Sequence, residues 1–473
     1  MQKTKTEKHL IVLIAACILS VTAMTLYSHS SPFYLMNPWE DVCGNLTIGK
    51  SMLNGIVLYR DIFEQRGPLL YFLHAFAWLI SPNNYHGIWI LEALASAAFV
   101  YFAYRILALY EKQSNIVFLP LVMILIYSSR SYGLGGSPEE FCMPLLTASL
   151  YILLKALKNE RMLTIGEYVW IGILSGAVLW IKFSMLGFYI GSVLPVLVLV
   201  FWGEGIKGFL RLILGVVLGV AVISIPVFAY FLLNNALESL FRVYFYINLN
   251  YYPFNDSVVY KLYFAALGLL DAIRKNWQYW ILIVIGLVQL FRIEKRPAVL
   301  AELLFGAAGL SIVIYSGGQQ YPYYALILSI YAIFALLVIP EMKSAAKTAV
   351  TAVAAICIAI FGWPKYQDRI NTGKEDYVQF RFAEKMEKGS TLLNYQFLDG
   401  GFFYAADILP SQYYAWSFNV LNEEIREEQN RYVAEGQTDY IVSRDRDVEE
   451  ADVNHQYELI EESEGCYLYQ RMR

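Results

Sequence analysis

The first 363 residues alternate long apolar stretches with short polar ones. An apolar stretch of roughly 17–25 residues is long enough to cross the hydrocarbon core of a bilayer as a helix. Eleven stretches approach or reach that length and are predicted to span a membrane: 9–28, 86–110, 115–132, 138–157, 166–182, 184–203, 208–233, 277–294, 298–316, 321–340 and 344–363. Residues 67–81 are apolar but short, which favours a re-entrant or interfacial helix, with a twelfth span as the alternative.

The composition agrees with an α-helical polytopic membrane protein. Hydrophobic residues make up 58% of the chain, charged residues only 16%, and the mean hydropathy is +0.45. These values lie on the apolar side of soluble domains. Three lysines precede the first apolar stretch, which has no convincing cleavage site, so we expect an anchor and not a removed signal. The five cysteines form no CxxC pair and no metal-binding spacing.

Lysine and arginine are unevenly distributed between alternate loops. With the N-terminus inside, the inner loops and helix ends carry fifteen of them and the outer ones nine. Cytoplasmic loops carry the excess of basic residues in membrane proteins. We therefore expect a protein of the plasma membrane with a cytoplasmic N-terminus. Eleven spans then place the C-terminal region outside the cytoplasm.

The apolar pattern ends near Trp363. We predict a membrane domain over 1–363, with a first outer loop at 29–85, and a small soluble α/β domain over 364–473. Strands are predicted at 390–397, 439–445, 457–462 and 466–472, and a charged helix at 421–435. Residues 365–473 contain 22 acidic and 12 basic residues, which argues against a nucleic-acid partner.

The first outer loop holds the densest charge of the membrane part: Glu40, Asp41, Lys50, Arg60, Asp61, Glu64 and Arg66. Asn37-Pro38 predicts a helix start and Gly55 its end. Apolar positions spaced by three and four predict an amphipathic helix at the membrane surface, with Glu40 and Asp41 in its first turn. The alternative is a solvated loop whose acids only keep it in water.

Other polar residues fall in the predicted outer half of the spans. They are Glu92, Arg130, Glu139, Glu140, Lys182 and the polar turn that contains Gln320 and Tyr324. Charges inside a membrane bundle are costly and by default suggest function. Together these groups predict an outer cavity for an amphiphilic ligand with a charged head. The alternatives are that Lys182 extends to the interface, that Glu92 and Glu302 bond neighbouring helices, and that the tyrosines mark the membrane surface.

The first outer loop resembles that of the GT-C membrane glycosyltransferases, which include the protein O-mannosyltransferase-like and aminoarabinose-transferase-like families. Asp41 stands eleven positions before Met52-Leu53, and Tyr59-Arg60-Asp61 and Arg66-Gly67-Pro68 follow before a short apolar helix. The acidic loop at 135–140, Lys182 and the late polar turn extend the likeness. Two features depart from it. Many relatives have lysine directly before the proline, and some have a charged residue or histidine in the late turn.

This resemblance implies an inverting transfer of one sugar from a polyprenyl-phosphate carrier to a hydroxyl of an envelope glycan, lipid or protein. Asp41 would be the general base. The donor phosphate would be bound by Arg66, Lys182, Gln320 and Tyr324. Supporting roles would fall to Glu40, Asp61, Glu64, Glu139 and Glu140. If a divalent cation, Mg or Mn, takes part, Asp41, Glu139 and Glu140 are its candidate ligands.

Three other classes of protein remain open from the sequence. A flippase or transporter of lipid-linked sugars would more typically show broken spans in both halves of the chain. A ligase for whole glycans would use an arginine-bearing outer loop, for which only Arg242 and Arg274 are available in the long loop 234–276. The third alternative is a structural assembly protein without catalysis.

Overall fold

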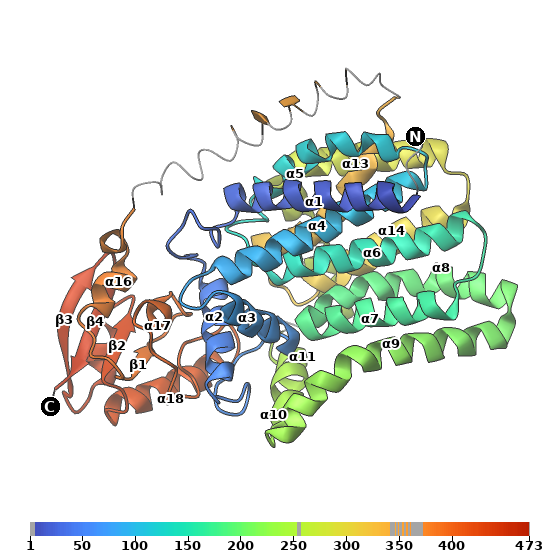
Figure 1. Cartoon of the computed structure of the whole chain (residues 1–473). Helices are drawn as coiled ribbons and strands as arrows, with labels where there is room; N and C mark the ends of the chain where they lie inside the picture. Colours follow the sequence, from blue (N-terminus) through green and yellow to red (C-terminus); the bar gives the residue numbers. More distant parts are fainter. Residues whose placement is uncertain are drawn as a thin grey trace. The chain divides into compact units, whose positions relative to one another are not determined.

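The computed structural model describes residues 5–252, 257–340 and 372–472, and scattered residues from 346 to 360 (Figure 1). The chain forms two compact units, each assembled from three separate stretches of sequence. The first combines Met1–Ser31, Trp89–Val227 and Pro253–Gln367. The second combines Pro32–Ile88, Phe228–Tyr252 and Asp368–Arg473. The predicted domain boundary at 363 lies outside the described residues and stays a prediction.

The first unit is a bundle of apolar helices. Its elements are α1 (Lys5–Tyr27), α4 (His86–Ala108), η1 (Gln113–Phe118), α5 (Leu119–Tyr127), α6 (Pro138–Lys158), α7 (Ile165–Lys182), η2 (Phe183–Leu186), α8 (Gly187–Gly203), α9 (Gly205–Leu233), α12 (Val258–Lys275), α13 (Trp277–Ile293), α14 (Pro297–Tyr315) and η4 (Pro322–Leu337). The first residues of α4 and the last residues of α9 belong to the second unit. In Figure 1, α1, α4 and α6 run alongside one another.

Six helical segments among the described residues are long and apolar enough to cross a membrane: His9–Tyr27, His86–Ala108, Pro138–Lys158, Ile165–Gly203, Gly205–Leu233 and Pro297–Tyr315. The pair α12 and α13, bent by 106°, would make a seventh. This confirms a polytopic helical membrane protein. The predicted spans 115–132 and 321–340 are shorter helices. Most of the predicted span 344–363 lies outside the described residues.

Two predicted spans, 166–182 and 184–203, form one helical segment of 39 residues, and the short 3₁₀ turn η2 marks the point between them. Its second half lies tightly against α14. A Cβ added to Gly191 would meet the Phe305 carbonyl oxygen at 1.9 Å, so only glycine permits this approach. The helix η4 fills the centre of the unit, because every residue from Tyr324 to Leu337 is buried.

Helix α12 was not predicted, since we treated residues 234–276 as a loop. It is amphipathic and carries Lys261, Asp271, Arg274 and Lys275. Asp271 bonds to Lys275 at 2.6 Å and to Arg274 at 3.1 Å. These charges interrupted the apolar pattern that identifies a span, although they lie one helical turn apart and support a helix.

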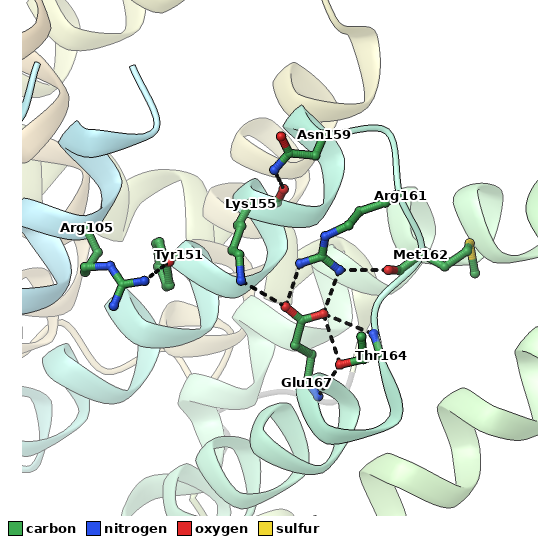
Figure 2. Close-up of polar contacts among 8 residues, drawn as sticks. All are labelled: Arg105, Tyr151, Lys155, Asn159, Arg161, Met162, Thr164 and Glu167. Atoms are coloured by element: carbon green, nitrogen blue, oxygen red, sulfur yellow. Dashed lines mark hydrogen bonds and ion pairs between the residues drawn. The ribbon is translucent and has the colours of Figure 1, made fainter. Parts of the chain in front are cut away.

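The loop between α6 and α7 is fixed by a polar cluster (Figure 2). Thr164 caps α7 by accepting a hydrogen bond from the Glu167 backbone N–H at 3.2 Å, and the Glu167 carboxylate accepts one from the Thr164 backbone. Two guanidinium nitrogens of Arg161 hydrogen-bond the same carboxylate at 2.6 and 2.7 Å, and the Lys155 ammonium lies 3.4 Å from it. This reciprocal cap explains why α7 begins here.

The second unit joins a short helical pair to a small sheet. Its elements are α2 (Glu40–Leu53), α3 (Pro68–Ile80), α10 (Leu237–Ser239), the π-helix η3 (Leu240–Ile247), α11 (Asn248–Asn250), η5 (Lys374–Asp376), α16 (Val378–Ala383), β1 (Leu392–Asn394), α17 (Phe402–Ala405), α18 (Asn422–Ala434), β2 (Tyr440–Ser443), α19 (Asp447–Ala451), β3 (Tyr457–Ser463) and β4 (Cys466–Arg471). Figure 1 shows the strands and α18 in the C-terminal part.

The four strands are ordered β1-β2-β4-β3. The first pair is parallel, and β4 is antiparallel to both of its neighbours. All four predicted strands and the helix predicted at 421–435 are confirmed. Short runs rich in apolar and aromatic residues marked these strands, and β1 and β2 are fully buried.

Helix α2 departs from its prediction in two ways. It begins at Glu40, not at Asn37, because the Asn37 side chain accepts a hydrogen bond from the Trp39 backbone at 3.0 Å and forms a turn before the helix. The prediction of a surface amphipathic helix is also wrong, since every residue from Asp41 to Ser51 is buried. A Cβ on Gly49 would meet the Ala75 nitrogen at 2.5 Å, so α3 covers that side.

Helix α3 has 13 residues and so measures about 20 Å, short of the roughly 30 Å hydrocarbon core. This length agrees with the prediction that residues 67–81 do not span.

Removal of the α7 cap should lower stability. Thr164→Ala loses the side-chain acceptor and should cost about 1 kcal/mol, seen as a lower apparent melting temperature of the detergent-purified protein. Thr164→Ser keeps the hydroxyl and should have the same apparent melting temperature as the wild type. Equal melting of all three proteins would mean that the cap contributes nothing.

Candidate functional site: a buried acid–arginine group and its surroundings

Asp41 forms an ion pair with Arg66 in the second unit. The Asp41 Oδ1 lies 2.6 Å from Arg66 Nη2, and Arg66 Nη1 lies 3.4 Å from Glu64 Oε1. The side chains of Asp41, Arg66 and Glu64 are 9%, 15% and 1% exposed. The structure therefore brings together three of the sequence-predicted site residues, which come from the start of α2 and from the segment before α3.

The backbone of Arg66 is held on both sides by tyrosines. The Tyr59 hydroxyl donates to the Arg66 carbonyl oxygen, and the Arg66 backbone N–H donates to the Tyr71 hydroxyl at 3.3 Å. Tyr59 and Tyr71 are both fully buried. Because two rigid aromatic side chains fix the main chain at this point, the guanidinium is placed before any ligand arrives.

The two acids of this segment, Asp61 and Glu64, have different surroundings. Burial raises the pKa of Glu64, against the lowering effect of the nearby Arg66 guanidinium. Asp61 has a different role, because it hydrogen-bonds Arg60 at 2.7 Å and accepts from the Val57 backbone at 2.8 Å. The Arg60 hydrogen bond lowers the pKa of Asp61. Asp61 therefore stabilises the turn and does not join the Asp41 group.

Three contacts tie α2 to the C-terminal part of the same unit. Glu40 pairs with Arg444, Thr47 donates to Asp399 at 2.6 Å, and Lys50 lies 2.5 Å from Asp407. Asp399 was not predicted as a site residue. Asp399 is 1% exposed and also accepts from the Gly401 backbone at 2.9 Å. Burial raises the pKa of Asp399 to about 6.

The first unit contains a second cation–acid pair. Lys182, at the end of α7, lies 2.5 Å from Glu139, in the first turn of α6. Its Nζ also lies 3.9 Å from the centre of the Tyr324 ring, a cation–π distance. Lys182 is thus engaged inside the unit. The Gln320 side chain is half-buried in the loop between α14 and η4.

Three further acids of the first unit bond to neighbouring backbone or side chains. Glu140 accepts from the Gly136 backbone at 2.9 Å. Glu92 accepts from Ser28 at 2.5 Å, and Glu302 of α14 accepts from Ser192 of α8 at 2.6 Å. The interpretation of Glu92 and Glu302 as inter-segment hydrogen-bond partners is confirmed.

Each of the three carboxylates nominated as metal ligands has a hydrogen-bond or ion-pair partner within its own unit. Asp41 and Glu139 are each paired with a basic side chain, and Glu140 accepts a backbone bond. Across the described ranges, no group of three or more His, Cys, Asp or Glu side chains is placed to hold a metal ion.

The architecture is the GT-C fold of membrane glycosyltransferases. Two crystal structures of ArnT from Cupriavidus metallidurans, one bound to undecaprenyl phosphate and one in the apo state, match 98% of this chain and 98% of their own. Both have a TM-score of 0.64 and 12% sequence identity. The oligosaccharyltransferase AglB from Archaeoglobus fulgidus, in complex with an inhibitory peptide and a dolichol-phosphate, matches 93% of this chain and 69% of its own, with 14% identity and a TM-score of 0.48.

The chain belongs to the family of the putative competence-induced protein Ccs4, whose N-terminal domain matches residues 1–352. No curated protein matches the sequence at a significant level.

The raised pKa of Asp399 predicts a pH dependence of stability. Its pKa of about 6 exceeds the ordinary value of 3.8, so its contribution is present below about pH 4 and is lost as the pH rises through 6. The loss amounts to at most about 3 kcal/mol. Asp399→Asn, which carries no charge, should therefore have a higher apparent melting temperature than wild type at pH 7.5 and a smaller advantage at pH 5.

Asp407→Asn is the control for this experiment, because Asp407 pairs with Lys50 but has an exposed side chain. Its difference from wild type should stay constant between the two pH values. A parallel pH dependence of wild type and Asp399→Asn would contradict the assignment.

Proposed function

We propose that this protein is an inverting glycosyltransferase that moves a single sugar from a polyprenyl-phosphate carrier to a hydroxyl of an envelope acceptor. The observation that carries the proposal is the buried Asp41–Arg66 pair in a chain with the GT-C fold. An acid and an arginine supply the two functions that such a transfer needs, a proton acceptor and a cation for the leaving phosphate.

Asp41 acts as the general base in this proposal. The acceptor oxygen attacks the anomeric carbon, the bond from that carbon to the phosphate oxygen breaks, and the hydroxyl proton passes to Asp41. Attack opposite the leaving group inverts the anomeric carbon. The departing phosphate keeps both electrons of the broken bond and needs no proton.

Arg66 stabilises the phosphate as its charge develops. Its planar guanidinium can bind a carboxylate and a phosphate oxygen at the same time, which an ammonium group does less precisely. In the first unit, Lys182, Tyr324 and Gln320 are proposed to bind donor phosphate. Glu64 orients Arg66 through the contact at 3.4 Å.

The chain is a multi-pass membrane protein. We further propose that its N-terminus is cytoplasmic and that residues 364–473 lie outside the cytoplasm. The excess of basic residues in the predicted inner loops supports this orientation.

Asp41→Asn should abolish transfer while leaving donor binding intact. The amide keeps the shape and a hydrogen bond to Arg66 but cannot accept the proton, so the rate should fall by roughly 10²–10⁴-fold. The measurement is release of polyprenyl phosphate from sugar-loaded polyprenyl-phosphate donors by purified protein, beside the Kd of the same donors.

Asp407→Asn makes the same chemical change at an exposed carboxylate and should keep the wild-type rate. Unchanged transfer by Asp41→Asn would remove Asp41 from the mechanism. Movement of intact donor across vesicle membranes, without sugar release from any donor, would favour the flippase alternative.

A further inference from the structure

An open polar cleft of about 590 Å³ lies within the second unit. Three segments distant in sequence form its walls: the turn at Tyr59 and Arg60, the stretch Ser239–Val243, and the C-terminal part, which contributes Tyr413, Tyr414 and residues of α18. All three belong to the same compact unit. The cleft is therefore a feature of that unit, and no residue of the proposed catalytic group lines it.

One wall is a π-helix. Residues Leu240–Ile247 adopt this rare form, which is found frequently at functional sites. It places Arg242 in the cleft lining. Arg60 bonds to Asp61 and Arg431 to Glu428, whereas Arg242 is exposed and makes no hydrogen bond or ion pair with any described residue. The cleft thus presents one guanidinium that is open to a ligand.

The turn at Tyr59 and Arg60, another part of the lining, contains backbone strain. Tyr59 has φ +66°, a left-handed conformation that bulky residues rarely adopt. The conformation is held because the Tyr59 ring stacks on Phe231 at 5.5 Å, its carbonyl accepts from the Tyr413 hydroxyl at 3.3 Å, and its hydroxyl donates to the Arg66 carbonyl. Such strain clusters at functional sites. Tyr59 therefore joins the cleft wall directly to the support of Arg66.

The lining chemistry favours a carbohydrate. Tyr413 is half-buried and presents aromatic surface on which a sugar ring can lie, and it packs edge to face against the buried Tyr414 at 4.8 Å. Glu424, which accepts from the Tyr414 hydroxyl at 2.7 Å, and Glu427 supply acceptors for sugar hydroxyls. Arg242 supplies a charge-assisted donor for an anionic group.

We propose that this cleft is an acceptor subsite, which binds a glycan carrying phosphate or carboxylate groups, and that Arg242 contacts the anion. The assignment of the bound glycan as the acceptor rests on the proposed function. The binding of an anionic glycan in the cleft does not depend on it. The experiment below also measures whether the cleft prefers a peptide or a neutral glycan.

The experiment measures Kd by calorimetry on the full-length protein in detergent. The probes are a phosphodiester-linked glycan oligomer, an oligomer of the same sugars with carboxylate groups, the neutral oligomer, and an acidic peptide of equal charge. Wild type should bind one or both charged glycans. Arg242→Gln should weaken that binding roughly tenfold or more and leave the neutral oligomer unchanged. Arg242→Lys, which keeps the charge, should restore part of the loss.

Arg426→Gln is the matched control, because Arg426 lies exposed on α18 but does not line the cleft. It should bind as the wild type does, and all variants should share its melting temperature. Equal loss for charged and neutral oligomers, no loss in Arg242→Gln, or tighter binding of the peptide would overturn the assignment.

The two proposals fail in different ways. If no sugar is transferred but anionic glycans bind through Arg242, the proposed function falls and the glycan site stands. If transfer depends on Asp41 while Arg242→Gln changes neither Kd nor the KM for a charged acceptor, the function stands and the subsite falls.

Discussion

The burial of α2 is the constraint on which the second unit depends. A helix whose residues Asp41–Ser51 are all buried carries an acid in its first turn, and an isolated buried carboxylate is too costly to keep. Arg66 satisfies that acid, and the two tyrosines that hold its backbone make the pairing reproducible. Removal of one partner of a buried pair costs far more than the pair contributes. The first outer loop is therefore folded around this contact.

The same burial explains why the C-terminal residues share a unit with this loop. The Thr47 hydroxyl and the Lys50 ammonium of α2 meet Asp399 and Asp407 at 2.6 and 2.5 Å. Glu40 is paired by Arg444. Because two of these three C-terminal partners are acids, part of the negative charge of residues 365–473 has a structural use.

Elements marked by a local sequence pattern could be predicted, whereas contacts between residues distant in sequence could not. The four strands and the helix at 421–435 were predictable because short apolar runs and the distribution of charges are local signals. The resemblance in the first outer loop identified Asp41, Arg66 and Glu64, which the structure groups together. It did not reveal Asp399, because a single Asp in FLDGG gains its meaning only from Thr47, 352 positions away. The burial of α2 was missed because it depends on segments distant in sequence. Helix α12 was missed because its charges interrupt the long apolar run that identifies a span.

The Asp41–Arg66–Glu64 group also has a charge balance that suits the proposed reaction. Burial raises the pKa of Glu64, against the lowering effect of the Arg66 guanidinium. Arg66 and Asp41 form an ion pair whose charges cancel. In the proposed mechanism, a donor phosphate that engages Arg66 would draw the guanidinium charge toward itself and away from the Asp41 carboxylate. Donor binding and the activation of Asp41 as a base would then be coupled through the Arg66 side chain.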